Sequence, residues 1–412
     1  MLTLKLKKFA ALLTASIFLF NPAAYAEEEP VQEQTAEQKD EEDFKKYAPV
    51  VEEPFAKEIK SPEAEATKKI EKLFEPKETE QTENFEGEGL EFLVHNEDGV
   101  MAFAVIAAHE QYKLRPMLAR NQIRGLSTLL QMSGSVNDIA MVNASYFTGR
   151  GILIGLTKID GVIVSNDYFN RSAIGINDDG STIFGRVRYD GKIIFGGEEL
   201  PVNVNCERGA NSAVVFNEYF GATTGTNNFG VELEVHDGII TNIFRGKGNN
   251  FILKGAHIIS AHGTAADFFA NARIGDEIIF SEEIISDDAD FNSVPNILGA
   301  GPRLVAGGQI SVTADIEEFP SDIKFGRAPR SAVGVTKYGD YILAVVDGRQ
   351  SHSRGCTLTE WAEILLNKFG AVDAINLDGG GSTELVVKDS LVNRPSDGSE
   401  RSVGSVLAIL PK

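Results

Sequence analysis

Two aspartates stand where short apolar runs of the chain end, and each is followed by glycine. Asp347 closes the run 341–346, and Asp378 closes the run 371–377. After Asp378 come three consecutive glycines and a serine: Gly379, Gly380, Gly381 and Ser382. Consecutive glycines let the backbone approach a ligand closely, and their N–H groups can hold an anion. These residues therefore predict two carboxylates beside a backbone that can bind an anionic group.

Arginines are concentrated in the same part of the chain, at Arg330, Arg349, Arg354, Arg394 and Arg401. A guanidinium binds phosphate through two parallel hydrogen bonds, so these residues suit an anionic substrate. Arginines also form ordinary surface salt bridges, and that reading stays open for each of them. The whole chain carries a net charge of −21 and shows no basic face, which argues against nucleic acid as a partner.

The elements that must position the two aspartates can be read from the same stretch. Short apolar runs bounded by turn residues are typical of buried strands. Between the two runs, residues 358–369 carry apolar side chains at helical spacing. Thr357 and Glu360 fit a capping box at the start of this helix, and Gly370 fits a stop at its end. If the two strands are parallel neighbours, both Asp-Gly corners lie at one edge of the sheet, where open α/β sheets bind ligands.

Four short motifs in this region resemble the phosphodiester glycosidase family. They are Arg330-Ser331-Ala332-Val333-Gly334, Asp347-Gly348-Arg349, Asn376-Leu377-Asp378-Gly379-Gly380-Gly381-Ser382 and Asn393-Arg394-Pro395-Ser396. Each motif alone is weak, but the four in this order and spacing are specific. The resemblance covers roughly residues 95–410 and is strongest over 299–410. One departure is Ala144, which stands where the family's strand ending in Asn-Gly-x-Phe usually has glycine.

An animal member of this family removes N-acetylglucosamine from a phosphodiester, so the resemblance implies a role for each candidate residue. Cleavage of a sugar 1-phosphodiester at the anomeric carbon expels a phosphate monoester, a good leaving group, so a carboxylate and phosphate-binding donors suffice. The candidate catalytic residues are Asp378, Asp347 and Arg349. The candidate substrate-binding residues are Arg330, Asn143, Asn376, Gly379, Gly380, Gly381, Ser382 and His262. The two asparagines either bind sugar hydroxyls or position an aspartate, and a purely structural role stays open for His262.

The start of the chain indicates export. In residues 1–26, three lysines precede an apolar run, and Ala24-Tyr25-Ala26 forms a cleavage site of the kind found in secretory signal peptides. This segment is too short for a membrane span, so none is expected after cleavage. Residues 27–86 hold 20 acidic and 9 basic residues and few large apolar ones, which predicts a disordered tether. We therefore expect a secreted, periplasmic or cell-envelope protein.

Residues 87–412 predict one large α+β domain, or two intimately packed ones, with strand-rich mixed sheets and a few packed helices, including the strand–helix–strand unit. Hairpin turns are expected at Asp160-Gly161, Asp179-Gly180, Asp190-Gly191 and Asp237-Gly238. Besides the capped helix, helical patterns cover 121–132 and 265–272. The segment 171–176, RSAIGI, echoes RSAVGV at 330–335, through an ancient duplication, two equivalent hairpins or coincidence. The echo carries no functional weight, except that either Arg171 or Arg330 could face a site.

No cofactor is required by this reading. The acidic loops 177–179 and 287–290 lack the twelve-residue calcium loop, although a structural Ca²⁺ stays possible, and no zinc-type His/Cys spacing is present. The two cysteines, Cys206 and Cys356, either form one disulfide or stay free. A thiol nucleophile at Cys356 with His352 as its base is a weaker alternative.

The sequence predicts an exported glycosidase that hydrolyses a sugar 1-phosphodiester, with N-acetylglucosamine or a similar envelope glycan as the sugar. Two other functions stay open. One is a non-catalytic carbohydrate or cell-wall binding module, and the other is a phosphodiesterase that cuts the P–O bond. The sequence names neither the sugar nor the oligomeric state.

Overall fold

A computed structural model of the 412-residue chain describes residues 83–84 and 89–412, which all belong to one unit, Glu58–Lys412. The predicted signal peptide, 1–26, lies outside the described residues, and so does nearly all of the predicted tether. Glu83–Asn84 forms a strand, β1, that pairs with the next strand, so the tether prediction is wrong at these two residues. In the described part, no helix is long and apolar enough to cross a membrane.

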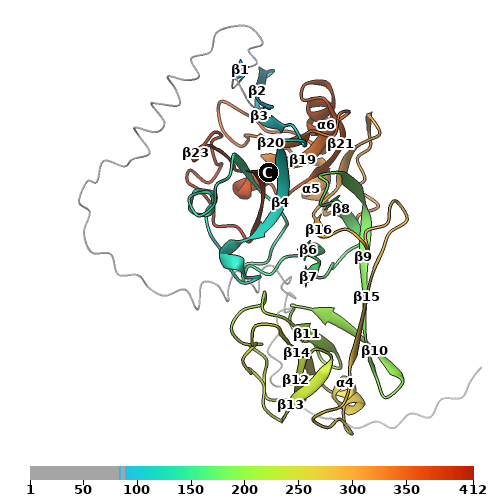
Figure 1. The fold of residues 1–412 in the computed structure, drawn as a ribbon. Helices are drawn as coiled ribbons and strands as arrows, with labels where there is room; N and C mark the ends of the chain where they lie inside the picture. Colours follow the sequence, from blue (N-terminus) through green and yellow to red (C-terminus); the bar gives the residue numbers. More distant parts are fainter. Residues whose placement is uncertain (1–82, 85–88) are drawn as a thin grey trace, which may run out of the picture. The chain divides into compact units, whose positions relative to one another are not determined.

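The described residues form three sheets and four short helices, which confirms the α+β class (Figure 1). The first sheet has eight strands in the order β1-β2-β3-β20-β19-β21-β17-β18. Their bounds are β1 Glu83–Asn84, β2 Leu90–Glu97, β3 Val100–Ala107, β20 Tyr341–Val346, β19 Arg330–Thr336, β21 Ala371–Asn376, β17 Arg303–Ala306 and β18 Gln309–Ile310.

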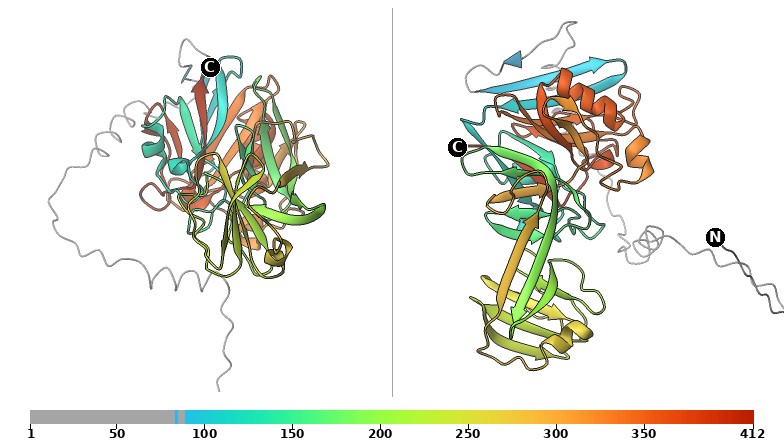
Figure 2. Two further views of the ribbon diagram at one scale, coloured as in Figure 1. Left: turned by 60° about the horizontal axis from the view of Figure 1, so that its bottom comes forward. Right: turned by 90° about the vertical axis from the view of Figure 1, so that its right-hand side faces the viewer.

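A five-stranded sheet packs against one face of the eight-stranded sheet. Its order is β23 Ser390–Leu391, β22 Leu385–Val387, β5 Ala140–Asn143, β24 Ser405–Pro411 and β4 Tyr112–Leu118. Side chains alternate along β20, so Leu343 and Val345 face the core shared with the five-stranded sheet, while Ala344 and Val346 face the helix α6, Leu358–Asn367. Figure 2 shows α6 on the outer face of this sheet. The helix α3, Leu129–Ser133, covers the far side of the five-stranded sheet.

The third sheet contains eleven strands, and its longest strand joins two groups of them. The order is β13 Ile239–Arg245, β12 Val231–His236, β14 Ala256–Ala261, β11 Ala213–Phe216, β10 Glu198–Val204, β9 Thr182–Phe195, β8 Arg171–Ile176, β16 Asn296–Gly299, β6 Thr157–Ile159 and β7 Val162–Ser165, with β15 Ile279–Ile285 paired to β9. The first half of β9 pairs with β8, and its second half pairs with β10.

The turn predicted at Asp190-Gly191 is wrong, because both residues lie inside β9. Gly191 pairs with Val202 on one side and Glu282 on the other, and the ring of Tyr189 covers the place where its side chain would be. The other three predicted turns are confirmed: each joins two antiparallel neighbours, and each of their glycines has a positive φ.

Of the three predicted helices, one is confirmed, one is shorter than predicted and one is wrong over most of its length. The capping box is present at the start of α6, where Thr357 Oγ1 accepts from the Glu360 N–H at 3.3 Å and the Glu360 carboxylate accepts from the Thr357 N–H at 2.9 Å. Residues 265–272 hold a shorter helix, α4 Thr264–Phe268. The predicted helix 121–132 is wrong over most of its length, since only a 3₁₀ turn, η1 Ala119–Asn121, and α3 form there. Backbone bonds from Ile123 to Tyr219 and from Ser127 to Val403 use the N–H groups that a helix would need. A fourth helix, α5 Ser321–Phe325, was not expected.

The two strands that end at the aspartates run in the same direction, but they are not neighbours. Strand β19 lies between β20 and β21 and is antiparallel to both. Arg330 pairs with Val346, and Ala332 pairs with Asn376. The ends of β20 and β21 and the start of β19 therefore share one edge of the sheet, as the site requires.

Candidate active site

Asp347 directly follows β20, and both of its carboxylate oxygens have hydrogen-bond partners. The side chain is 2% exposed. Its Oδ1 accepts from Asn393 Nδ2 and from the Arg394 N–H, each at 3.0 Å, and its Oδ2 lies 2.9 Å from His352 Nε2. With both oxygens engaged, Asp347 is better suited to hold His352 and the 393–394 segment in place than to attack a substrate. His352 lies near the site through this bond and points to Asp347 rather than to a thiol.

Asp378, at the end of β21, is in a different electrostatic state. Its Oδ1 accepts from the Gly379 N–H at 2.9 Å, and Ser382 also hydrogen-bonds its side chain. Burial raises the pKa of Asp378 to about 6, while these hydrogen bonds and the charge of Arg401 oppose the rise. The side chain keeps partial solvent exposure. At neutral pH Asp378 is mostly ionised, yet its proton affinity is high enough for work as a nucleophile or a base.

The glycine turn is built for close packing. A side chain at Gly379 would meet the Pro329 carbonyl at 2.9 Å, and one at Gly381 would meet the Arg401 guanidinium at 2.1 Å. Gly380 has φ +64° and donates its N–H to the Pro329 carbonyl at 2.9 Å. The N–H groups of Gly379 and Gly380 therefore bind the protein itself, and their predicted role as donors to a substrate stays a prediction.

Two arginines beside this turn have no ion-pair partner among the described residues. Arg330 is 3% exposed and donates only to the backbone carbonyls of Cys356, Ile323 and Gly326. Burial lowers the pKa of Arg330, and the nearby charge of Arg349 lowers it further. Arg349 is exposed, and its guanidinium lies 3.4 Å from where a Gly380 side chain would begin.

Two other arginines of the group form surface salt bridges, the alternative that the sequence left open. Arg354 pairs with Glu360 at 3.6 Å, and Arg401 pairs with Asp397. The fifth arginine, Arg394, is exposed and forms no ion pair among the described residues either, and only its backbone N–H binds Asp347. Arg330, Arg349 and Arg394 are therefore the arginines of this group whose charge an anionic ligand could balance, and the first two lie beside the glycine turn.

The two candidate asparagines are fully buried, and their hydrogen bonds hold neighbouring parts of the site in place. Asn143 Nδ2 donates to the Asp378 carbonyl at 2.7 Å, and its Oδ1 accepts from Ser331 Oγ at 2.6 Å and from the Glu384 N–H at 3.2 Å. Asn376 Nδ2 donates to the Tyr146 hydroxyl at 3.0 Å. These contacts favour the positioning alternative over direct binding of sugar hydroxyls. The departure at Ala144 is accommodated, because its carbonyl accepts from the Asp378 N–H at 2.9 Å.

Two further residues lie at this site. Tyr146 was not among the candidates, whereas the sequence leaves open whether Glu384, just after the glycine turn, reaches the same pocket or points to solvent. The Tyr146 hydroxyl donates to the Gly301 carbonyl at 3.1 Å, and burial and the charge of Asp378 raise its pKa. Glu384 is 0% exposed, and its Oε1 accepts from the Arg401 N–H at 2.6 Å, while its Oε2 has no hydrogen-bond partner. Burial raises the pKa of Glu384 to about 8. For Tyr146, only its position three residues after Asn143 could have pointed to the site.

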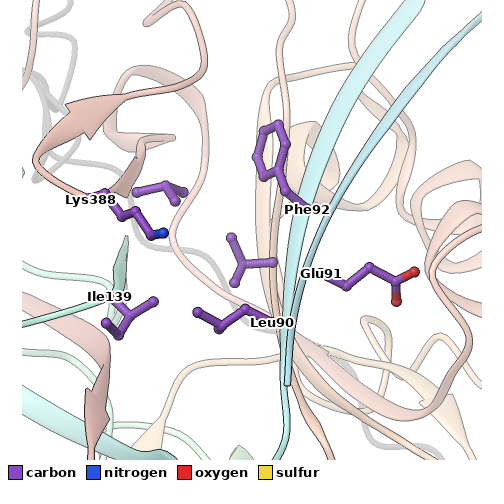
Figure 3. A pocket seen from close by; sticks show the side chains of 7 residues that line it. Leu90, Glu91, Phe92, Ile139 and Lys388 are labelled. Atoms are coloured by element: carbon purple, nitrogen blue, oxygen red, sulfur yellow. The ribbon is translucent and has the colours of Figure 1, made fainter. Parts of the chain in front are cut away.

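His262 is not brought to the aspartates. It follows β14 in the eleven-stranded sheet, where its N–H donates to the Ser212 carbonyl and its ring meets Phe229 edge-on at 6.3 Å. A narrow apolar cleft (Figure 3) also lies apart from the candidate residues. It is lined by Leu90, Glu91, Phe92, Val105, Ile139, Val387 and Lys388.

No group of three or more metal-binding side chains occurs in the described part of the chain. In the acidic loops, Asp179, Asp288 and Asp290 each accept a backbone N–H of their own surroundings. A structural Ca²⁺ there stays an untested prediction. Cys206 and Cys356 are free and buried, and burial raises the pKa of each thiol to about 12, which disfavours a thiolate nucleophile.

Residues 229–410 match the family model described as phosphodiester glycosidase, so the chain contains a domain of this family and the predicted resemblance is confirmed over that segment. Bovine N-acetylglucosamine-1-phosphodiester alpha-N-acetylglucosaminidase is 36% identical over 159 residues, which cover 36% of this chain and 29% of the bovine protein. A crystal structure of a Synechocystis protein aligns with a TM-score of 0.68 and 26% identity, over 78% of this chain and 62% of that one. A Burkholderia pseudomallei protein shares the fold, with a TM-score of 0.63 and 22% identity over 76% of this chain and 74% of that one.

The family match contains both aspartates, Arg330 and Arg349, whereas Asn143 and Tyr146 precede it. The site is therefore assembled from the matched segment and from an earlier part of the chain.

Proposed function

We propose that this protein is an exported glycosidase that hydrolyses a sugar 1-phosphodiester, of the N-acetylglucosamine-phosphate type, at the anomeric carbon. The observation that carries the proposal is an ionisable carboxylate, Asp378, beside two arginines without ion-pair partners. Membership of the phosphodiester glycosidase family supports it, and the predicted signal peptide supports export.

In the proposed hydrolysis, each residue of the site has a separate role. Arg330 and Arg349 bind the phosphodiester and stabilise the charge that grows on the departing phosphate. Asp378, in its ionised form, attacks the anomeric carbon or activates a water molecule. Because a phosphate monoester leaves readily, no strong general acid is needed. Asp347 holds His352, and Asn143 fixes the backbone at Asp378.

Hydrolysis of a panel of sugar 1-phosphodiesters, beginning with α-linked N-acetylglucosamine, tests the proposal. We expect wild type to release free sugar, and Asp378→Asn and Arg349→Ala to lose at least a hundredfold in kcat/KM. Arg354→Ala, which removes the same charge from an arginine that pairs with Glu360, serves as the control and should stay within about threefold. Equal activity in all folded variants would remove Asp378 and Arg349 from the chemistry.

The same reaction in ¹⁸O-labelled water separates the proposed activity from that of a phosphodiesterase. Glycosidic cleavage puts the label on the sugar, whereas P–O cleavage puts it on the phosphate. Sugar-phosphate binding that survives Asp378→Asn, with no turnover by wild type, would instead indicate a binding module.

A further inference from the structure

Arg171, the first residue of β8, has its guanidinium among three aromatic rings. Its Cζ lies 3.9 Å from the centroid of Phe319, 4.3 Å from that of Phe169 and 5.8 Å from that of Tyr146. Only its Nε makes a hydrogen bond to another described residue, the carbonyl of Glu317 at 3.4 Å. Aromatic faces hold a guanidinium by cation–π attraction and leave its edge free to donate.

The charge of Arg171 has no ion-pair partner in the described part of the chain. The acidic residues whose charges act on Arg171 are Glu317 and Glu318, and both raise its pKa without outweighing burial. The Glu317 carboxylate accepts hydrogen bonds from Ser172 Oγ at 2.6 Å and from the Arg303 N–H at 3.0 Å. Among the described residues, Glu318 forms no ion pair. Burial among the rings also lowers the pKa of Arg171. A half-buried guanidinium with this little compensation favours an incoming anion.

Arg171 is joined to the candidate site by two independent connections. The first is Tyr146, whose hydroxyl accepts from Asn376 and which feels the charges of Asp378, Arg330 and Arg171. The second is the segment 317–326, which contacts Arg171 through Phe319 and accepts from Arg330 at Ile323 and Gly326. The helix α5, Ser321–Phe325, lies in this segment, two residues after Phe319.

We propose that Arg171 binds an anionic group, a carboxylate or phosphate, on the alcohol that the phosphodiester joins to the sugar. This inference rests on the proposed function, because it names the substrate class of that site. Arg330 and Arg349 flank the glycine turn and bind the scissile phosphate. Arg171 contacts Tyr146 and binds the alcohol part of the substrate, beyond the phosphate. Phe169, whose side chain is 41% exposed, adds an apolar surface for the carbon chain of that alcohol.

Two matched substrates test the proposal: α-N-acetylglucosamine 1-phosphodiesters of 1-propanol and of 3-hydroxypropanoate. They differ only in a terminal carboxylate. We expect wild type to prefer the carboxylate substrate at least tenfold in kcat/KM. Arg171→Gln should lose this preference and keep its kcat/KM for the propyl ester within about twofold, and Arg171→Lys should keep part of the preference. Arg188→Gln, at an exposed arginine of β9, is the control for loss of charge alone.

Equal kcat/KM for the two substrates in wild type, or the same preference in wild type and Arg171→Gln, would overturn the inference and leave the proposed function standing. If neither substrate is hydrolysed, the proposed function fails, and calorimetry of the two products decides the inference by itself. Tighter binding of 2-carboxyethyl phosphate than of propyl phosphate, in wild type but not in Arg171→Gln, would support it. Equal binding of the two by wild type would contradict it.

Discussion

The two aspartates occupy the same kind of position in the sequence, yet their surroundings give them different chemistry. Asp347 receives hydrogen bonds on both oxygens, from Asn393, Arg394 and His352. Asp378 receives fewer and is held in a setting that raises its pKa to about 6. Neighbours distant in sequence cause this difference, so the pattern of apolar run, aspartate and glycine predicts the place of both residues but not which of them reacts.

The role of Asp378 sets the pH dependence of activity. If its ionised form is the reactive one, kcat/KM falls about tenfold per pH unit below about pH 6. Since the charge of Arg401 lowers the pKa of Asp378, Arg401→Gln should move this acid limb to higher pH. Rate profiles between pH 4 and 8 measure the shift, and Arg354→Gln should leave the limb in place. A limb that moves to lower pH in Arg401→Gln would contradict the assignment.

The raised pKa of Glu384 predicts how the stability of the protein depends on pH. Its ordinary pKa is 4.5, and burial raises the folded-state value to about 8. Between these values the unfolded chain releases a proton that the folded chain retains, so this residue's contribution to stability falls as the pH rises from about 4.5 to 8. Glu384→Gln removes that loss and keeps an oxygen to accept from Arg401.

Thermal unfolding of the two proteins measures the effect. The Tm of Glu384→Gln minus that of wild type should be smallest near pH 4.5 and grow to a plateau above about pH 8. A difference that is independent of pH would show that Glu384 ionises normally in the folded protein.

At the level of the elements, Asn143 ties three parts of the site together: the end of β5, the start of β19 and the glycine turn. Asn143→Ala leaves buried partners unpaired on all three. We expect a loss of about 3 kcal/mol in the free energy of unfolding, with a fall in kcat and little change in KM. Asn242→Ala, at an exposed position on β13, should change stability by less than about 0.5 kcal/mol. A rise in KM without loss of stability would instead assign Asn143 to sugar binding.

The sequence predicted the elements whose signals are local. Strand β20, helix α6 with its capping box, and the end of β21 follow from apolar spacing and from Thr357 and Glu360. It did not predict that β19 lies between β20 and β21, because strand order is set by pairing between distant segments. For the same reason the helix expected over 121–132 failed, since backbone bonds to Tyr219 and Val403 outweigh a helical pattern. Local propensity is a weak guide where distant partners compete.

Across the whole molecule, the same limit explains why Tyr146 was missed and why nothing in the sequence connected Arg171 with the two aspartates. Tyr146 and Arg171 lie about 200 residues or more before Asp378 in the chain. Tyr146 contacts Asn376, while Arg171, whose part in the site is our proposal, contacts Phe319 and Glu317. The echo between the segments that begin at Arg171 and Arg330 was the only sequence signal that singled out both arginines.

The two cysteines test the packing of two separate parts of the molecule. Cys356 lies in the core beneath α6, and Cys206 lies in a different core with Phe216 and Phe220. Both are free and buried, and burial raises the pKa of each thiol to about 12. A maleimide or disulfide reagent reacts with an exposed thiolate, so the native protein should show almost no labelling near pH 7.5.

Denaturation without a reductant should then release two reactive thiols, and prior treatment with a reductant should change neither this number nor the Tm. Rapid labelling of the native protein would show that one of the cores opens readily. No labelling after denaturation, followed by labelling of two thiols once a reductant is added, would show that Cys206 and Cys356 are paired. Because the two side chains pack in different cores, such a pairing would require the β10–β11 region and the α6 region to be arranged differently from the fold described above.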